Sequence, residues 1–162
     1  MSRNLFARIG GTAVAVAALS VTMLATSASA GPPPGEDVTP NDVVPLGPYC
    51  ANGFHCVFLA GLGSARHSYF NSDTNFAGDT FDDGTGVNNY VWSASNSSTG
   101  GYESHYYYGA NYSGGLVFCV NPGGEVVPSE LTDDGIDGNG VGRRDEASSL
   151  RLRPGTTISC FN

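Results

Sequence analysis

The four cysteines are the residues whose chemistry is most directly readable from the sequence. Cys50, Cys56, Cys119 and Cys160 could form disulfides or bind a metal ion. A zinc site needs close Cys/His pairs at finger-like spacing, and only His55 lies beside a cysteine. An even number of cysteines therefore indicates two disulfides and an oxidising compartment. Three pairings are possible, and the short Gly-containing segment between the first two cysteines favours Cys50–Cys56 with Cys119–Cys160.

Other side chains that could carry chemistry do not form an enzyme motif. The sequence has no Gly-x-Ser-x-Gly elbow, no phosphate-binding glycine loop and no His-Glu-x-x-His pair. His55, His67 and His105 are isolated from one another in sequence. The sequence therefore predicts a protein that is not an enzyme and has no cofactor.

A cluster of tyrosines offers a binding function in place of catalysis. Its members are Tyr102, Tyr106, Tyr107, Tyr108 and Tyr112. On a strand, alternation places Tyr106 and Tyr108 on one side and Tyr107 on the other. Some of these rings should then be exposed and could stack on a glycan or a protein partner. The alternative is that they fill the core and the corner of a hairpin.

The charge of the chain limits its partners. The sequence has fifteen acidic residues, and two of its seven basic residues, Arg3 and Arg8, lie in the first ten positions. Beyond those positions five arginines and no lysine remain, a formal net charge of −10. Such a chain repels phosphate backbones, so nucleic acid is excluded as a partner. We expect a monomer outside the cell.

The chain divides into three parts by composition. Residues 1–30 have two arginines, an apolar run from Ala13 to Ala25 and a small-residue end, as in a secretory signal peptide. The apolar run is shorter than the roughly 18 residues that a membrane span needs. Residues 31–48 hold six prolines and are predicted to be an extended linker. Residues 49–162 form the predicted domain.

The predicted domain has the pattern of an all-β protein. Short runs of Val, Phe and Tyr alternate with clusters of Gly, Asn, Asp and Ser, and no segment keeps a helical period. We predict a loop over Thr132–Arg144, whose acidic residues partly match the spacing of an EF-hand but lack flanking helices. The predicted strands are His55–Ala60, His67–Asn71, Tyr90–Ser95, Glu103–Tyr108, Leu116–Val120, Ser148–Arg153 and Thr157–Phe161.

Three motifs together carry a resemblance to a known family. The segment from Tyr107 to Gly114 spaces two aromatic residues and a glycine so that they could fold over a hairpin. The Ser-Ser pair that ends at Ser149 could tie this hairpin to the next strand by hydroxyl–backbone hydrogen bonds. With Cys50-x5-Cys56-Val-Phe58, these motifs resemble the small secreted metalloproteinase inhibitors of Streptomyces. The resemblance implies a disulfide-bonded, βγ-crystallin-like β-sandwich of two Greek keys.

The resemblance also implies a function and a reactive bond. In that family the inhibitory bond follows a cysteine and precedes an apolar residue, which Cys119–Val120 matches. Thermolysin-like zinc peptidases prefer an apolar residue just after the scissile bond. A disulfide at Cys119 and the nearby Pro122 would reduce the ordering cost of binding. The implied protein is a secreted inhibitor of an extracellular metallopeptidase, acting through a substrate-like loop.

The alternative is a non-inhibitory module of the crystallin type that binds calcium, a glycan or a protein. Two six-residue segments, Asn88–Ser93 and Arg144–Ser149, can be aligned as an internal repeat and resemble crystallin calcium motifs. Their oxygen-bearing residues are Asn88, Asn89, Ser93, Asp145 and Ser148. Arg144 and Trp92 replace one ligand in each segment, so we expect weak calcium binding or none.

Overall fold

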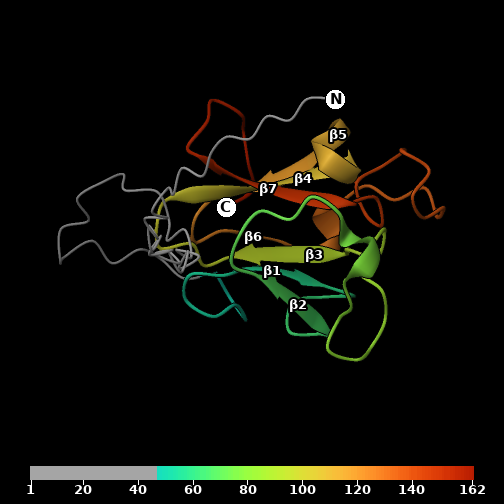
Figure 1. Cartoon of the computed structure of the whole chain (residues 1–162), viewed down its shortest axis with the longest axis horizontal. Coiled ribbons are helices and arrows are strands. Elements are labelled where there is room, and N and C mark those ends of the chain that lie inside the picture. The colour runs from blue at the N-terminus through green and yellow to red at the C-terminus, as the bar shows by residue number, and fades with distance from the viewer. Residues whose placement is uncertain (1–46) are drawn as a thin grey trace, which may run out of the picture. The chain divides into compact units, whose positions relative to one another are not determined.

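Short antiparallel strands build the whole described part of the protein. A computed structural model describes residues 47–162, where it contains seven strands, three 3₁₀ segments and no α-helix (Figure 1). The strands are β1 (His55–Phe58), β2 (Arg66–Tyr69), β3 (Ser93–Asn96), β4 (Tyr102–Gly109), β5 (Ser113–Val120), β6 (Glu125–Val126) and β7 (Ser149–Pro154). The 3₁₀ segments are η1 (Phe76–Gly78), η2 (Ala110–Tyr112) and η3 (Pro128–Glu130). The predicted all-β class is confirmed.

The predicted signal peptide (residues 1–30) and nearly all of the predicted linker (31–48) lie outside the described residues. Within residues 47–162, none of the helical segments has the length and apolar character needed to cross a membrane.

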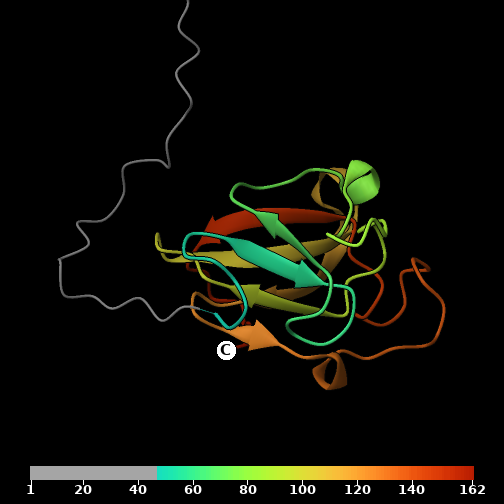
Figure 2. The same cartoon turned by 90° about the horizontal axis from the view of Figure 1, so that it is seen from below.

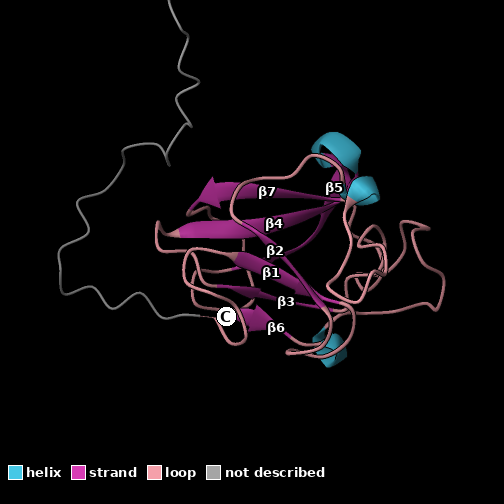
Figure 3. Cartoon of the chain, turned by 60° about the horizontal axis from the view of Figure 1, so that its bottom comes forward, coloured by secondary structure: helices cyan, strands magenta, loops and turns pink. Residues whose placement is uncertain are grey.

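The strands form two antiparallel sheets that stack as two layers (Figures 2 and 3). The order in the first sheet is β2-β1-β3-β6, and in the second it is β5-β4-β7. Asp73 extends the second sheet, because it forms an antiparallel bridge with Leu150 of β7. Strand β6, from the second half of the domain, likewise extends the sheet of the first half. Each half of the domain therefore contributes one segment, Asp73 or β6, to the sheet of the other half.

The core lies between the two sheets and is made of the apolar residues that alternate along the strands. The inner faces contribute mainly Val, Phe and Tyr side chains, which are the residues that fit a pleated surface. Its buried members are Val57, Tyr69, Phe76, Phe81, Val87, Val91, Ala94, Tyr106, Val117, Phe118, Val120, Val126, Leu131, Ala147 and Leu150.

In each half of the repeat, one serine hydroxyl ties a hairpin to a later strand. Ser149 donates a hydrogen bond to the carbonyl oxygen of Gly109 (2.8 Å) and accepts one from the backbone N–H of Tyr112 (3.2 Å). Ser93, at the equivalent position of β3, donates to the carbonyl oxygen of Ala60 (2.6 Å). The predicted tie between the hairpin and Ser149 is confirmed, and the first half repeats it.

The β4–β5 hairpin also shows the predicted aromatic pair and glycine turn. The rings of Tyr107 and Tyr112 lie 5.8 Å apart. Gly114 has φ 77°, and a Cβ atom there would lie 3.0 Å from the Cβ of Tyr108. This position therefore favours glycine on both conformational and steric grounds.

Both predicted disulfides are confirmed: Cys50 pairs with Cys56, and Cys119 pairs with Cys160. The predicted strand over Thr157–Phe161 is wrong. Only Phe161 forms a bridge there, to Val120, because the preceding residues bond to side chains instead: Thr156 bonds to Glu103, and the N–H of Ile158 bonds to the Thr156 hydroxyl. The predicted strand over Tyr90–Ser95 begins only at Ser93, and the two-residue β6 was not predicted.

Candidate functional site

The Cys119–Val120 bond does not lie on a binding loop. Both residues belong to β5, where Cys119 pairs with His105 and Val120 with Ser104 of β4. Cys119 is 2% exposed and Val120 is fully buried. A bond held in a paired, buried strand cannot enter a peptidase cleft while the fold is intact. The prediction of a reactive bond at Cys119–Val120 is therefore wrong for this structure. Cys119 instead links β5 to the C-terminal segment through its disulfide with Cys160.

The exposed loop lies instead between η3 and β7. Residues 132–144 contain no strand or helix, as predicted, and in Figure 1 this orange segment extends well beyond the strand ends. Two apolar side chains lie on it without cover: Ile136 is 61% exposed and Val141 is 55% exposed. Each directly follows a glycine with φ 79°, Gly135 and Gly140. The loop therefore presents apolar residues to solvent on a narrow, glycine-flanked backbone.

A buried carboxylate holds the second half of this loop. Glu146 is 1% exposed, and its two oxygens accept hydrogen bonds from the backbone N–H groups of Asn139 (3.2 Å) and Gly140 (2.7 Å). Asn139 in turn accepts from the backbone N–H of Val141 (2.7 Å) through its side-chain oxygen. Hydrogen bonds to a charged group are among the stronger ones in proteins. Glu146 thus anchors the residues directly before Val141.

Further contacts close the loop on the other side of Val141. The hydroxyl of Tyr108 donates to the carbonyl oxygen of Gly142 (2.5 Å). The N–H groups of Arg143 and Arg144 both donate to the carbonyl oxygen of Thr132, at 2.8 and 3.1 Å. Val141 therefore lies exposed between two anchored stretches, a geometry that reduces the conformational freedom lost when a partner binds.

The base of the loop rests on the junction between the two halves of the repeat. The N–H of Asn89 donates to the carbonyl oxygen of Ala147 (3.0 Å), and the N–H of Asp145 donates to that of Val91 (3.1 Å). Asn89 and Asp145 have nearly the same left-handed backbone, with φ 60° and 61°. These reciprocal bonds show that the predicted alignment of residues 88–93 with residues 144–149 is a structural repeat.

The two residues that depart from the calcium pattern contact each other. The Arg144 guanidinium lies over the Trp92 ring, 4.4 Å from its centroid, and Arg144 also forms an ion pair with Asp133. Trp92 is half-buried. A cation–π contact of this kind stabilises a fold by roughly 0.5–2 kcal/mol.

Asp145 is the most perturbed carboxyl group at this junction. Burial raises its pKa to about 6, with the negative charge of Asp137 adding to the effect, while Trp92 and Arg144 oppose it. Its Oδ1 is buried without a hydrogen-bond partner, and its Oδ2 lies 4.0 Å from the Arg144 Nε. Burial thus disfavours the charged form of the Asp145 carboxyl group, whereas the neighbouring Arg144 cation favours it.

Several of the predicted calcium residues bond to other protein groups at this junction. Among the five predicted calcium residues, Ser148 donates its hydroxyl to the side-chain oxygen of Asn89 (2.8 Å), and Ser93 is used in a hairpin tie. The charged guanidinium of Arg144 already stands beside Asp145. The predicted ligands are therefore divided among separate structural roles.

A second possible ligand group is also occupied. His105, Cys119 and Cys160 place their ligand atoms within 4.8 Å of one another, but both sulfur atoms belong to the disulfide. Within residues 47–162 no other group of three metal-ligating side chains was found.

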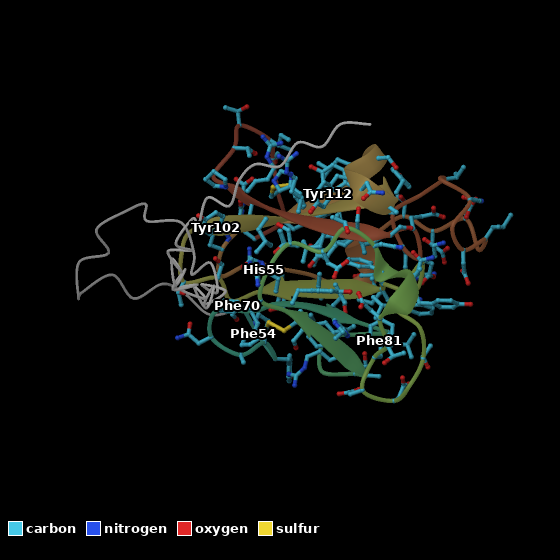
Figure 4. The ribbon with its side chains drawn as sticks, in the orientation of Figure 1. Phe54, His55, Phe70, Phe81, Tyr102 and Tyr112 are labelled. Carbon is cyan, nitrogen blue, oxygen red and sulfur yellow. A yellow bond between two sulfur atoms is a disulfide. The ribbon has the colours of Figure 1, made fainter. Side chains whose placement is uncertain are left out.

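The tyrosine cluster does not form one exposed face. Tyr106 is fully buried, and Tyr102, Tyr107, Tyr108 and Tyr112 are half-buried. Figure 4 shows Tyr102 and Tyr112 near opposite ends of the β4–β5 hairpin. Burial lowers the pKa of His55 to about 4, and its Nδ1 lies 2.6 Å from the Ser104 hydroxyl.

Comparisons of the chain with family models, with curated proteins and with solved structures returned no match in any of the three. The sequence predicted the exposed loop but missed Ile136 and Val141 as its prominent residues. The available signal was local: each is an apolar residue directly after a glycine in an otherwise polar stretch.

Proposed function

We propose that this chain is a secreted peptidase inhibitor that acts through residues 132–144, with Val141 as the residue that enters the peptidase. The observation that carries this proposal is the exposure of Val141 between two anchored stretches. A loop of this kind can occupy a cleft with a small loss of conformational entropy. The inhibitory element thus moves from Cys119–Val120 to the exposed loop.

The arrangement of the strands supports the inhibitor class. Each half of the domain ties its hairpin by a serine and lends one segment to the opposite sheet. A βγ-crystallin-like sandwich of two Greek keys would have these features, which favours the resemblance to secreted metalloproteinase inhibitors. Two disulfides suit export to an oxidising compartment.

The apolar character of Val141 favours a thermolysin-like metallopeptidase as the partner. Such an enzyme receives an apolar side chain just after the scissile bond, and the valine side chain fits that requirement. Inhibition is stoichiometric, because the anchors at Gly140 and Gly142 hold the loop in place whether or not a bond in it is cut. Fixing a side chain in advance avoids roughly 0.5–1.5 kcal/mol of ordering cost for each one immobilised.

A titration against a thermolysin-like enzyme tests the proposal with a matched pair of variants. Val141→Ser removes the anchored apolar side chain, and Ile136→Ser makes the same change on the part of the loop that Glu146 does not hold. Because burying a valine side chain contributes about 1.5–3 kcal/mol, Val141→Ser should weaken inhibition by roughly 10- to 100-fold. Ile136→Ser should have a much smaller effect. Absence of inhibition by the unaltered protein at micromolar concentration would refute the function.

The second candidate function is a crystallin-type module that binds calcium without inhibiting a peptidase. One observation favours it: the buried Oδ1 of Asp145 has no hydrogen-bond partner and lies at the junction where Asn89 and Ser148 meet. Calorimetry with calcium separates the two functions. The inhibitor proposal expects no binding heat, whereas the module expects heat that Asp145→Ala removes.

A further inference from the structure

A buried Glu–His pair lies against only one of the two disulfides. His105 is fully buried in β4, and its Nε2 lies 2.6 Å from the Oε2 of Glu103. The same Nε2 lies 4.0 Å from the Cys160 Sγ, and the ligand atoms of His105, Cys119 and Cys160 all lie within 4.8 Å of one another. Glu103 also holds Thr156 of the C-terminal segment, but the proposed inhibition uses neither Glu103 nor His105.

At the other disulfide, the sulfur atoms have hydrogen-bond contacts with neutral groups. The Cys50 Sγ lies 3.3 Å from the carbonyl oxygen of Phe54, and the Cys56 Sγ lies 3.4 Å from the Ser68 hydroxyl. The two disulfides therefore differ, because only Cys119–Cys160 lies beside the Glu103–His105 pair. Cys50–Cys56 serves as an internal reference.

The surroundings keep Glu103 as a carboxylate. Burial alone would raise its pKa, but hydrogen bonds from the N–H and hydroxyl of Thr156 (2.8 Å each) and from His105 lower it. This carboxylate places a negative charge 2.6 Å from the His105 Nε2. The Nδ1 of His105 is buried and has no hydrogen-bond partner.

We propose that Cys119–Cys160 is a redox-active disulfide that accepts electrons from a dithiol reductant, with His105 stabilising the thiolate that forms. A thiolate is stabilised by a neighbouring imidazolium, and a disulfide whose reduced form is stabilised is the more oxidising one. This proposal does not depend on peptidase inhibition.

The exchange proceeds in two balanced steps. A thiolate of the dithiol attacks the half-buried Cys160 Sγ, the disulfide bond breaks, and the Cys119 sulfur leaves with the electron pair next to His105. The second thiol of the reductant then attacks its own sulfur in the mixed disulfide and releases Cys160. The reductant ends as a disulfide and has supplied two electrons and two protons. One proton resides on a protein thiol and the other on the imidazole.

Reduction also removes one of the ties on the C-terminal segment. Besides the disulfide, this segment is held at Val120 by a bridge to Phe161, at Asn121 by bonds to Cys160 and Asn162, and at Glu103 by Thr156. Most of these contacts lie within two residues of Cys160. With the disulfide open, these contacts alone hold the segment against β4 and β5.

A redox titration of the full chain with reduced and oxidised dithiothreitol tests the proposal. Differential alkylation followed by peptide mass analysis reports each disulfide separately. His105→Gln keeps a donor for Glu103 but cannot become a cation. His67→Gln is the control, because the His67 side chain bonds to the carbonyl oxygen of Thr80. His105→Gln should shift the equilibrium constant of Cys119–Cys160 by about tenfold toward the oxidised form, which corresponds to about 30 mV. Cys50–Cys56 should not shift.

A second measurement needs no variant and keeps the proposal testable if His105→Gln fails to fold. In the reduced wild-type protein, the alkylation rate of Cys119 or Cys160 should stay high below the pH at which an ordinary thiol loses reactivity. Cys50 and Cys56 should follow the ordinary thiol profile. The proposal is overturned if all four cysteines share that ordinary profile, or if a folded His105→Gln protein keeps the wild-type equilibrium constant.

Discussion

The carboxylate of Glu146 offers the sharpest test of how the exposed loop is held. Its two oxygens accept N–H groups from Asn139 and Gly140 at 3.2 and 2.7 Å. Glu146→Gln keeps the shape of the side chain but removes its charge and turns one acceptor into a donor. A hydrogen bond to a charged group contributes about 1.5–3 kcal/mol. A loss of about 2 kcal/mol increases the local opening equilibrium of the loop roughly 30-fold.

Amide hydrogen exchange followed by NMR measures this opening directly. The amides of Asn139 and Gly140 should exchange roughly 30-fold faster in Glu146→Gln, while core amides such as that of Val57 keep their protection. Glu130→Gln is the matched control, because Glu130 accepts only the N–H of Val127 at the start of η3. Unchanged exchange at Asn139 and Gly140 in folded Glu146→Gln protein would show that the carboxylate does not hold the loop.

Three further predictions concern the framework that supports the loop. The raised pKa of Asp145 means that folding favours its protonated form, so the stabilisation from this group is full below pH 3.8 and is lost as the pH rises through about 6. This contribution is about 3 kcal/mol, and urea unfolding should show that Asp145→Asn removes this part of the pH dependence. Ser149→Ala removes two hydrogen bonds, whereas Ser93→Ala removes one. Thermal unfolding should therefore show the larger loss of stability, about 1–3 kcal/mol, for Ser149→Ala. Equal losses of stability in the two variants would contradict the role of Ser149 in tying the hairpin. Gly114→Ala should destabilise the fold more than Gly115→Ala, because both have positive φ but only Gly114 lacks room for a Cβ atom; equal midpoints in denaturant would contradict the steric reason.

The local features of the fold could be predicted from the sequence because short-range geometry decides them. The Cys50–Cys56 ring closes within seven residues, which left Cys119 and Cys160 for each other. The Tyr107–Gly114 turn needs the glycine at its end and Ser149 further along the chain. Both residues belong to motifs that are visible in the sequence. The loop over residues 132–144 was predictable because no apolar period runs through it.

The features that failed depend on contacts between segments far apart in sequence. Cys119 and Val120 match a reactive bond in isolation, yet pairing with β4 buries both. Trp92 and Arg144 looked like separate defects in two calcium motifs until the repeat placed them in contact. In the C-terminal segment, hydrogen bonds to Glu103 replaced the strand pairing that Thr157–Phe161 suggested.

The central claim is that the anchored Val141 carries the inhibitory contact. The most direct measurement is the ratio of the inhibition constants of Val141→Ser and Ile136→Ser against one thermolysin-like peptidase, with both variants shown to be folded. The proposed function predicts that Val141→Ser is the weaker inhibitor by roughly tenfold or more. A ratio near one, or an inhibition constant for Val141→Ser equal to that of the unaltered protein, would contradict it.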